Sequence, residues 1–169
     1  MSKADDATSS AAAAGQQLLD ATGISAILNR LADEIAARAG KNKGQVPAFV
    51  GIHTRGVTVA QRVRAILAER GLEVPLGTVD ISLYRDDLDH RTTNPEIQAS
   101  EIPFDVDAAH IIIFDDVLYT GRTIRSAMEG LMGYGRPAKI ELAVLVDRGN
   151  RELPIQPDYV GERLSLIHI

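Results

Sequence analysis

The chain has 169 residues, a formal net charge of −5 at pH 7 and no cysteine. Its length suits a single domain with its own core, and a hydrophobic fraction of 45% with 24% charged residues is typical of a globular protein rather than a disordered or fibrous one. The missing cysteine excludes disulfides, thiolate metal sites and a cysteine nucleophile, and the acidic charge argues against a dedicated nucleic-acid binder without excluding a local basic patch.

Residues 1–16 are rich in Ala, Ser and Asp and predict a mobile leader. They lack the strongly apolar stretch of a secretory signal. No run of apolar residues approaches the roughly 18 that span a bilayer. We therefore expect a cytoplasmic protein with no membrane partner.

Hydrophobic periodicity then predicts alternating helices and strands. Ile24, Leu28, Leu31 and Ile35 share one face of a helix, and the continuous apolar run 110–114 is typical of a strand buried on both faces of a parallel sheet. In chain order the expected elements are a helix around 24–35, a strand at 46–53, a helix around 59–67, a strand at 76–84, a long aperiodic loop at 85–102, a strand at 110–114, a helix at about 123–134 and a strand at 139–146. This alternation predicts an α/β fold with a mostly parallel central sheet flanked by helices.

Two adjacent carboxylates, Asp115 and Asp116, follow the apolar strand and lead through a small turn into a helix. Ligands of open α/β sheets bind at the carboxyl ends of strands. In the turn, Gly121 lets the backbone approach a ligand, Thr120 and Thr123 offer hydroxyl donors, and the first N–H groups of the helix favour a phosphate. The carboxylates can accept hydrogen bonds from vicinal sugar hydroxyls, so the segment is interpreted as a pocket for a ribose 5-phosphate. The alternative is an Asx turn with a helix N-cap, and the absence of a Gly-x-x-x-x-Gly-Lys pattern argues against a Walker phosphate loop.

Two further segments follow predicted strands. At Thr54, Arg55 and Gly56, backbone N–H groups and the Arg55 guanidinium could hold a pyrophosphate, although an ordinary strand–helix turn is the alternative. The charged loop that begins near Tyr84 and Arg85 could close over a ligand and exclude water, or it is a solvated excursion.

These residues together resemble a known family. The stretch from Asp115 to Thr123 is similar to the phosphoribosyl-pyrophosphate-binding motif of type I phosphoribosyltransferases. More narrowly, the chain resembles the bifunctional pyrimidine operon regulator/uracil phosphoribosyltransferase proteins. The matching stretches, which run in order from about residue 18 to 161, are 51–56, 80–88, 135–137, 142–149, 151–155 and 158–161.

The resemblance implies a type I phosphoribosyltransferase fold with a small hood, and a reaction in which uracil and phosphoribosyl pyrophosphate (PRPP) give UMP and pyrophosphate. It also implies that PRPP carries Mg²⁺, with no side-chain metal site assigned. The catalytic residues would be Asp115, Asp116 and Arg55. The residues that would bind PRPP are Thr54, Arg55, Gly56, Tyr84, Arg85, Asp115, Asp116, Val117, Leu118, Tyr119, Thr120, Gly121, Arg122 and Thr123. Val146, Asp147 and Arg148 would bind the base, and relatives suggest a homodimer or homotetramer.

The family's second activity is binding of pyrimidine-operon mRNA, from a basic surface that includes the first helix. Here that helix carries Asp33 and Glu34 beside its arginines, His53 stands where relatives often have Lys, and Asn150 stands where His is usual. These departures spare the catalytic motifs but weaken the basic surface. Residues 164–169 do not fit the family pattern, so we expect a phosphoribosyltransferase domain at 17–163 and a non-native or truncated tail.

Three functions remain open from the sequence. The first is a uracil phosphoribosyltransferase that also regulates pyrimidine genes. The second is an RNA-binding attenuation regulator whose nucleotide pocket is only a sensor. The third is a phosphoribosyltransferase for another base, because the phosphoribosyl motif alone does not choose the acceptor.

Overall fold

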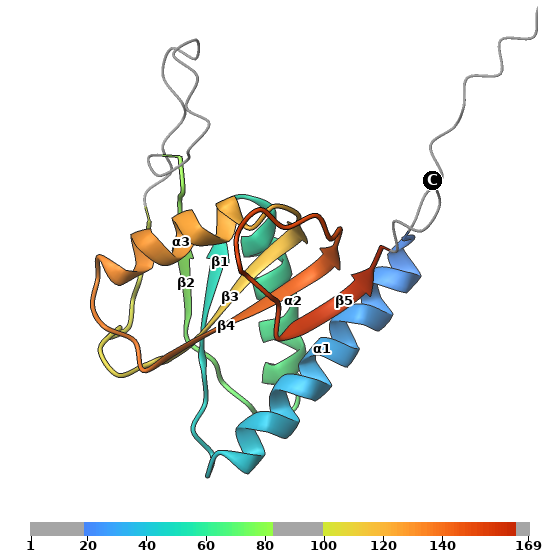
Figure 1. The fold of residues 1–169 in the computed structure, drawn as a ribbon. Helices are drawn as coiled ribbons and strands as arrows, with labels where there is room; N and C mark the ends of the chain where they lie inside the picture. The colour runs from blue at the N-terminus through green and yellow to red at the C-terminus, as the bar shows by residue number, and fades with distance from the viewer. Residues whose placement is uncertain (1–18, 83–99, 165–169) are drawn as a thin grey trace, which may run out of the picture.

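The computed structural model describes residues 19–82 and 100–164. In chain order its elements are α1 (Ala21–Lys41), β1 (Ala48–Ile52), α2 (Arg55–Glu69), β2 (Leu76–Val79), β3 (His110–Leu118), α3 (Arg122–Met132), β4 (Lys139–Asp147) and β5 (Tyr159–Arg163). The five strands form one sheet in the order β2-β1-β3-β4-β5, and every neighbouring pair is parallel (Figure 1). The prediction of an α/β fold with a parallel sheet and flanking helices is confirmed.

Two hydrophobic layers hold the helices against opposite faces of the sheet. On one face, α1 and α2 pack over β-strand residues such as Phe49, Ile112 and Phe114. On the other face, α3 packs over residues such as Val50, Ile111 and Ile113. Because β3 is central and faces a layer on each side, its apolar run is completely buried, as expected for an interior parallel strand.

The local sequence explains where α1 begins and how it is oriented. The Asp20 carboxylate accepts a 2.7 Å hydrogen bond from the Gly23 backbone N–H, which satisfies one of the otherwise unpaired donors at the helix start. Ile27, Leu28, Leu31 and Ile35 are buried on one side of this helix. The periodicity seen in the sequence is therefore the face that α1 turns to the sheet.

Two strands differ by several residues from their predicted bounds, and a third strand was not predicted. β3 continues to Leu118 rather than ending at residue 114, because its pairing with β4 extends to the register pair Leu118 and Asp147. β2 ends at Val79 rather than residue 84. β5 is not predicted by the sequence, because only its first residues, Tyr159 to Gly161, turn inward, and the strand is too short to show a period.

The predicted leader, most of the predicted tail and most of the long charged loop lie outside the described residues. The division into leader, domain and tail therefore stays a prediction, as does the small hood. In the part of the chain that the structure describes, no helix is long and apolar enough to cross a membrane.

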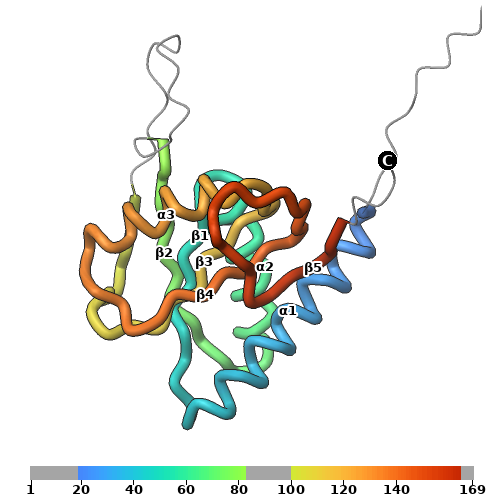
Figure 2. Tube along the Cα trace, in the orientation of Figure 1, coloured from blue at the N-terminus to red at the C-terminus, as the bar shows by residue number. Residues whose placement is uncertain are grey.

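Figure 2 follows the path of the chain between β4 and β5, which returns toward the start of α3. There the backbone N–H groups of Glu152 and Leu153 both donate to the Thr120 carbonyl, at 2.9 and 3.2 Å. This connection fixes the turn between β3 and α3 from the side opposite the sheet. The fold thus brings the ends of β1, β2 and β3 together with the start of α3 at one edge.

Candidate active site at the carboxyl edge of the sheet

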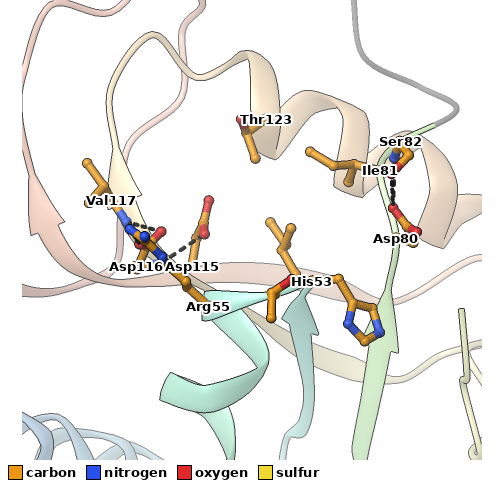
Figure 3. Close-up of a pocket in the computed structure, with 11 residues that line it drawn as sticks. His53, Arg55, Asp80, Ile81, Ser82, Asp115, Asp116, Val117 and Thr123 are labelled. Carbon is orange, nitrogen blue, oxygen red and sulfur yellow. Dashed lines mark hydrogen bonds and ion pairs between the residues drawn. The ribbon is translucent and has the colours of Figure 1, made fainter. Parts of the chain in front are cut away.

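A polar cavity of about 400 Å³ lies at the carboxyl ends of β1, β2 and β3 (Figure 3). Its walls come from three separate segments of the chain and from the first turn of α3. The lining residues are Ile52, His53, Thr54, Arg55, Asp80, Ile81, Ser82, Asp115, Asp116, Val117 and Thr123. We call this cavity the edge pocket.

Asp115 and Asp116 stand side by side within the last part of β3, so the strand itself fixes their direction. Asp115 is 7% exposed, and one of its oxygens accepts a 2.9 Å hydrogen bond from the backbone N–H of Asp116. Asp116 is more open and accepts a bond of the same length from the N–H of Val117. Burial raises the pKa of Asp115 to about 7, and the neighbouring Asp116 charge adds to this rise against the lowering effect of the backbone hydrogen bond.

Arg55 begins α2, one residue after Thr54, and its side chain is 84% exposed. Its Nη1 lies 3.6 Å from Asp116 Oδ2, so the arginine lies beside the carboxylate pair, on the same side of the pocket (Figure 3). The peptide bond between His53 and Thr54 is cis. Gly56 is buried, and a Cβ at this position would meet the Phe114 carbonyl oxygen. Gly56 is therefore needed for the close approach of α2 to β3, and it does not itself line the edge pocket.

The turn from β3 into α3 has the glycine geometry that the sequence indicates. Gly121 has a φ of 93°, a left-handed conformation that favours glycine. A Cβ at this position would lie 3.4 Å from the Ile155 side chain. Thr120 Oγ1 accepts a 3.3 Å hydrogen bond from the Arg122 N–H. Of the motif residues from Asp115 to Thr123, four line the edge pocket: Asp115, Asp116, Val117 and Thr123. The motif residues that are not among its walls are Leu118, Tyr119, Thr120, Gly121 and Arg122.

The segment predicted to bind the base lies at the end of β4, beside the edge pocket but not among its walls. Asp147 is buried, with one carboxylate oxygen 2.8 Å from Arg151 Nη2 and the other 3.2 Å from Arg163 Nη1. The Arg148 guanidinium lies 4.5 Å from the centre of the Tyr119 ring. Val146, the residue before Asp147 in β4, is half-buried. The carboxylate of Asp147 is thus already neutralised by protein groups.

Five residues that line the pocket are absent from the predicted site: Ile52, His53, Asp80, Ile81 and Ser82. Asp80, Ile81 and Ser82 follow β2, whereas the sequence places them inside a longer strand. Asp80 is buried and accepts hydrogen bonds from the Ser82 N–H at 2.8 Å and the Ser82 hydroxyl at 2.5 Å. The spacing Asp-x-Ser after an alternating apolar run was the available signal, since such residues form local side-chain turns at strand ends. The predicted ligands Tyr84 and Arg85 lie outside the described residues.

The residues of the edge pocket can bind a polyhydroxylated anion. Arg55 and the start of α3 offer positive charge and donors, while Asp115, Asp116 and Asp80 offer acceptors for hydroxyl groups. Within the described residues, no group of three or more His, Cys, Asp or Glu could hold a metal ion.

Comparison with known proteins identifies a matching family and similar sequences. The family model described as "Phosphoribosyl transferase domain" matches residues 15–168. The chain is 50% identical over 151 residues to a "Bifunctional protein PyrR" of Roseiflexus sp. (strain RS-1), covering 88% of this chain and 81% of the relative. It is 50% identical over 149 residues to the protein of the same name from Deinococcus radiodurans, covering 87% and 80%.

Solved structures share the fold at much lower identity. A hypoxanthine phosphoribosyltransferase from Staphylococcus aureus has a TM-score of 0.68 at 20% identity, covering 90% of this chain and 79% of that chain. The hypoxanthine phosphoribosyltransferase of Trypanosoma cruzi has a TM-score of 0.67 at 19% identity, covering 86% and 79%. At this identity the likeness concerns the arrangement of strands and helices alone.

Proposed function

Because the chain belongs to the phosphoribosyl transferase domain family, we propose that it transfers the phosphoribosyl group of PRPP to uracil, giving UMP and pyrophosphate. One observation carries this proposal. The edge pocket brings the Asp115–Asp116 pair, the Thr54–Arg55 turn and Thr123 at the start of α3 to a single cavity. These are the acceptor, cation and phosphate-binding groups that PRPP requires.

Each part of PRPP has a matching part of the edge pocket. The 5′-phosphate binds beside Thr123 and the first N–H groups of α3, where the helix dipole favours an anion. The ribose hydroxyls donate to Asp115 and Asp116. The pyrophosphate lies against Thr54 and Arg55, and Tyr84 and Arg85, which lie outside the described residues, are proposed as further ligands of PRPP.

Mg²⁺ enters this proposal as part of the substrate. The ion is carried mainly by the oxygens of PRPP, as the family resemblance implies, and no side-chain metal site is assigned to the chain. When bound, the ion neutralises charge on the pyrophosphate as it leaves. The chain's own contribution is to hold the sugar, to orient it and to place the Arg55 charge nearby.

The reaction needs no nucleophilic side chain. A ring nitrogen of uracil forms the new bond to the anomeric carbon, the bond from that carbon to the pyrophosphate oxygen breaks, and the nitrogen's proton is released. Positive charge develops on the sugar while negative charge develops on the leaving group. Rate enhancement therefore comes from orientation and from neutralising pyrophosphate, which the geometry of Arg55 and the two aspartates supports.

The choice of uracil rests on the resemblance to the bifunctional pyrimidine operon regulator/uracil phosphoribosyltransferase proteins, and relatives named "Bifunctional protein PyrR" that are 49–50% identical support it. The hypoxanthine enzymes share only the fold, so a purine acceptor has the weaker support. Under this proposal the base lies beside Val146 and Arg148 at the end of β4, next to the sugar carbon that it attacks. Asp147, held by Arg151 and Arg163, keeps this segment in place.

The family resemblance implies a second activity, UMP-responsive binding of pyrimidine-operon mRNA by a homodimer or homotetramer, and the word "bifunctional" in the relatives' name agrees with two activities. The measurement that separates it from catalysis is titration of a hairpin from a pyrimidine-gene leader at several salt concentrations. Phosphate contacts make such binding weaken steeply with salt. A salt-independent or sequence-indifferent result would remove the regulator from the proposal.

The decisive experiment follows UMP formation directly from PRPP, Mg²⁺ and uracil, with hypoxanthine and guanine as matched alternative acceptors. Uracil-dependent UMP is the expected result. Product only with a purine would keep the transferase and replace the base. A folded protein that binds PRPP but makes no product would favour the sensor–regulator function instead.

A further inference from the structure

A second cavity, of about 250 Å³, lies between α1 and α2 on the face of the sheet opposite α3. It is next to the edge pocket but separate from it. Its walls are Ile24, Leu28, Arg55, Thr58, Val59, Arg62, Asp116 and Leu145. We call this cavity the helix pocket.

The helix pocket has an apolar floor and a charged rim. Ile24 and Leu28 of α1, Val59 of α2 and Leu145 of β4 form the floor. The rim carries two guanidinium groups, Arg55 and Arg62, and a single carboxylate, Asp116, so it has an excess of one positive charge. This excess stands out on a chain whose net charge is −5.

Arg62 is the rim residue that the fold does not use. It is exposed on α2, and within the described ranges it makes no hydrogen bond or ion pair. Arg64, two residues along, shows the contrast, because its Nε donates a 2.7 Å bond to the Val74 carbonyl and ties the helix end to the chain. A guanidinium beside an apolar cavity can both pair with an anion and stack on a ring.

From these features we propose that the helix pocket binds a small aromatic anion, with its ring on the apolar floor and its charged group at Arg62. The volume lies just below the roughly 300–1,000 Å³ of pockets for drug-sized ligands, which limits the ligand to one or two rings. The positive excess selects an anion over a cation or a neutral ring.

The wall that separates the two pockets is the Arg55–Asp116 pair, 3.6 Å apart, which lines both of them. An anion in the helix pocket attracts Arg55 away from the edge pocket, where the proposed function places pyrophosphate. Occupation of the helix pocket therefore weakens PRPP binding, and by linkage PRPP weakens the aromatic anion by the same factor. This second step rests on the proposed function, whereas the existence of the site does not.

The test uses naphthalene-1-sulfonate, followed by its own fluorescence anisotropy on titration with the full chain in the absence of PRPP. Saturable binding is expected, and Arg62→Gln should weaken it about tenfold, as expected for loss of a charged hydrogen-bond partner. Ile24→Glu should abolish it by placing a carboxylate over the floor. Arg125→Gln is the matched control, since Arg125 is an exposed arginine on α3, on the opposite face, and it should leave the affinity unchanged.

Lack of saturable binding, or equal affinity in the wild type and Arg62→Gln, would overturn the site. The coupling is then read by repeating the titration with saturating PRPP and Mg²⁺, whose own binding is measured by calorimetry. Weaker naphthalene-1-sulfonate binding is expected. If PRPP binds but the probe's affinity stays the same, the coupling is wrong and the site stands; if PRPP itself does not bind, the proposed function fails independently.

Discussion

Asp115 on β3 and Glu141 on β4 are both buried acidic residues, 7% and 4% exposed, yet their pKa values move in opposite directions. Burial raises the pKa of Asp115 to about 7, and its closest charged neighbour is another carboxylate. Burial would also raise the pKa of Glu141, but hydrogen bonds and charge from Lys139 and His110 outweigh it and lower the pKa. Burial therefore sets the direction at Asp115, whereas the charged partners set it at Glu141.

Glu141 belongs to a closed network near the amino ends of β3 and β4. Its Oε1 is 2.6 Å from Lys139 Nζ, and its Oε2 is 3.0 Å from His110 Nε2 and accepts a 3.1 Å hydrogen bond from the Tyr159 hydroxyl. The Arg38 guanidinium covers the Tyr159 ring at 4.3 Å. Burial and the nearby Glu141 charge raise the pKa of Tyr159 to about 12, so this hydroxyl stays a donor. At this amino edge of the sheet, the charged side chains pair with one another and stabilise the fold. At the carboxyl edge, Asp115 and Asp116 instead line a cavity.

The largest expected effect is on catalysis, at the two aspartates of the edge pocket. Asp115→Asn and Asp116→Asn should each cut the rate of UMP formation by about 100-fold or more, because both carboxylates accept hydrogen bonds from the sugar in the proposed complex. The fold should survive, since neither carboxylate is held by a buried cation. Steady-state kinetics with PRPP and uracil, together with thermal melts, measure both effects.

Glu141→Gln serves as the counterpart for these variants, because it removes a buried charge on the neighbouring strand without touching the edge pocket. If both aspartate variants retained wild-type rates, their assignment to the sugar hydroxyls would be wrong. A loss of rate accompanied by unfolding would instead make them structural.

At the amino edge the expected effect is on stability. Glu141→Gln should lower the free energy of unfolding by about 2 kcal/mol, because His110, Lys139 and Tyr159 lose a shared charged acceptor. The exposed parts of Lys139 and Arg38 can regain water, which limits the loss. Urea unfolding measures the change. Turnover per folded molecule should match the wild type, and a specific loss of turnover would mean that the two edges are coupled.

The sequence predicts the carboxyl edge better than the amino edge for a physical reason. Asp115, Asp116 and Thr123 are close along the chain and follow a buried apolar strand, so a local pattern identifies them. The partners of Glu141 come from α1, β3 and β5, so only the folded sheet brings them together. Nothing in the sequence around Glu141 distinguishes it from a solvated glutamate.

Strand ends were the weakest part of the fold prediction. The apolar run predicts β3 only to residue 114, but pairing with β4 continues through the two aspartates to Leu118. In the same way, the alternation past β2 predicts a strand through Asp80, Ile81 and Ser82, which instead turn away and line the edge pocket. Hydropathy shows which residues are buried, whereas backbone pairing depends on a neighbouring strand that lies elsewhere in the chain.

Two arginine variants test whether the carboxyl edge serves binding of PRPP and the amino edge serves stability. Arg55→Gln should raise the KM for PRPP about tenfold while changing stability by less than about 0.5 kcal/mol, because its partner among the described residues, Asp116, forms a solvent-exposed ion pair with it. Arg38→Gln should do the opposite and lower stability by about 1 kcal/mol through the lost contact with Tyr159. Equal KM values in the wild type and Arg55→Gln would remove Arg55 from the pyrophosphate site.

The smallest expected effect is the opposite pH dependence of the two carboxylates. Between its unfolded pKa of 3.8 and its folded pKa of about 7, Asp115 binds more proton in the folded state than in the unfolded state. Its contribution to stability is therefore complete below 3.8 and is lost as the pH rises through about 7. Asn cannot titrate, so the stability of Asp115→Asn relative to the wild type should increase by about 1 kcal/mol between pH 6 and pH 7. Glu141 acts in the other direction, because its lowered pKa gives stability above its unfolded value of 4.5 that is lost as the pH falls through the folded value. Denaturant titrations of the wild type and both variants across pH 3.5–8 measure the free energy of unfolding at each pH. A pH-independent difference between Asp115→Asn and the wild type would show that folding does not raise the pKa of Asp115.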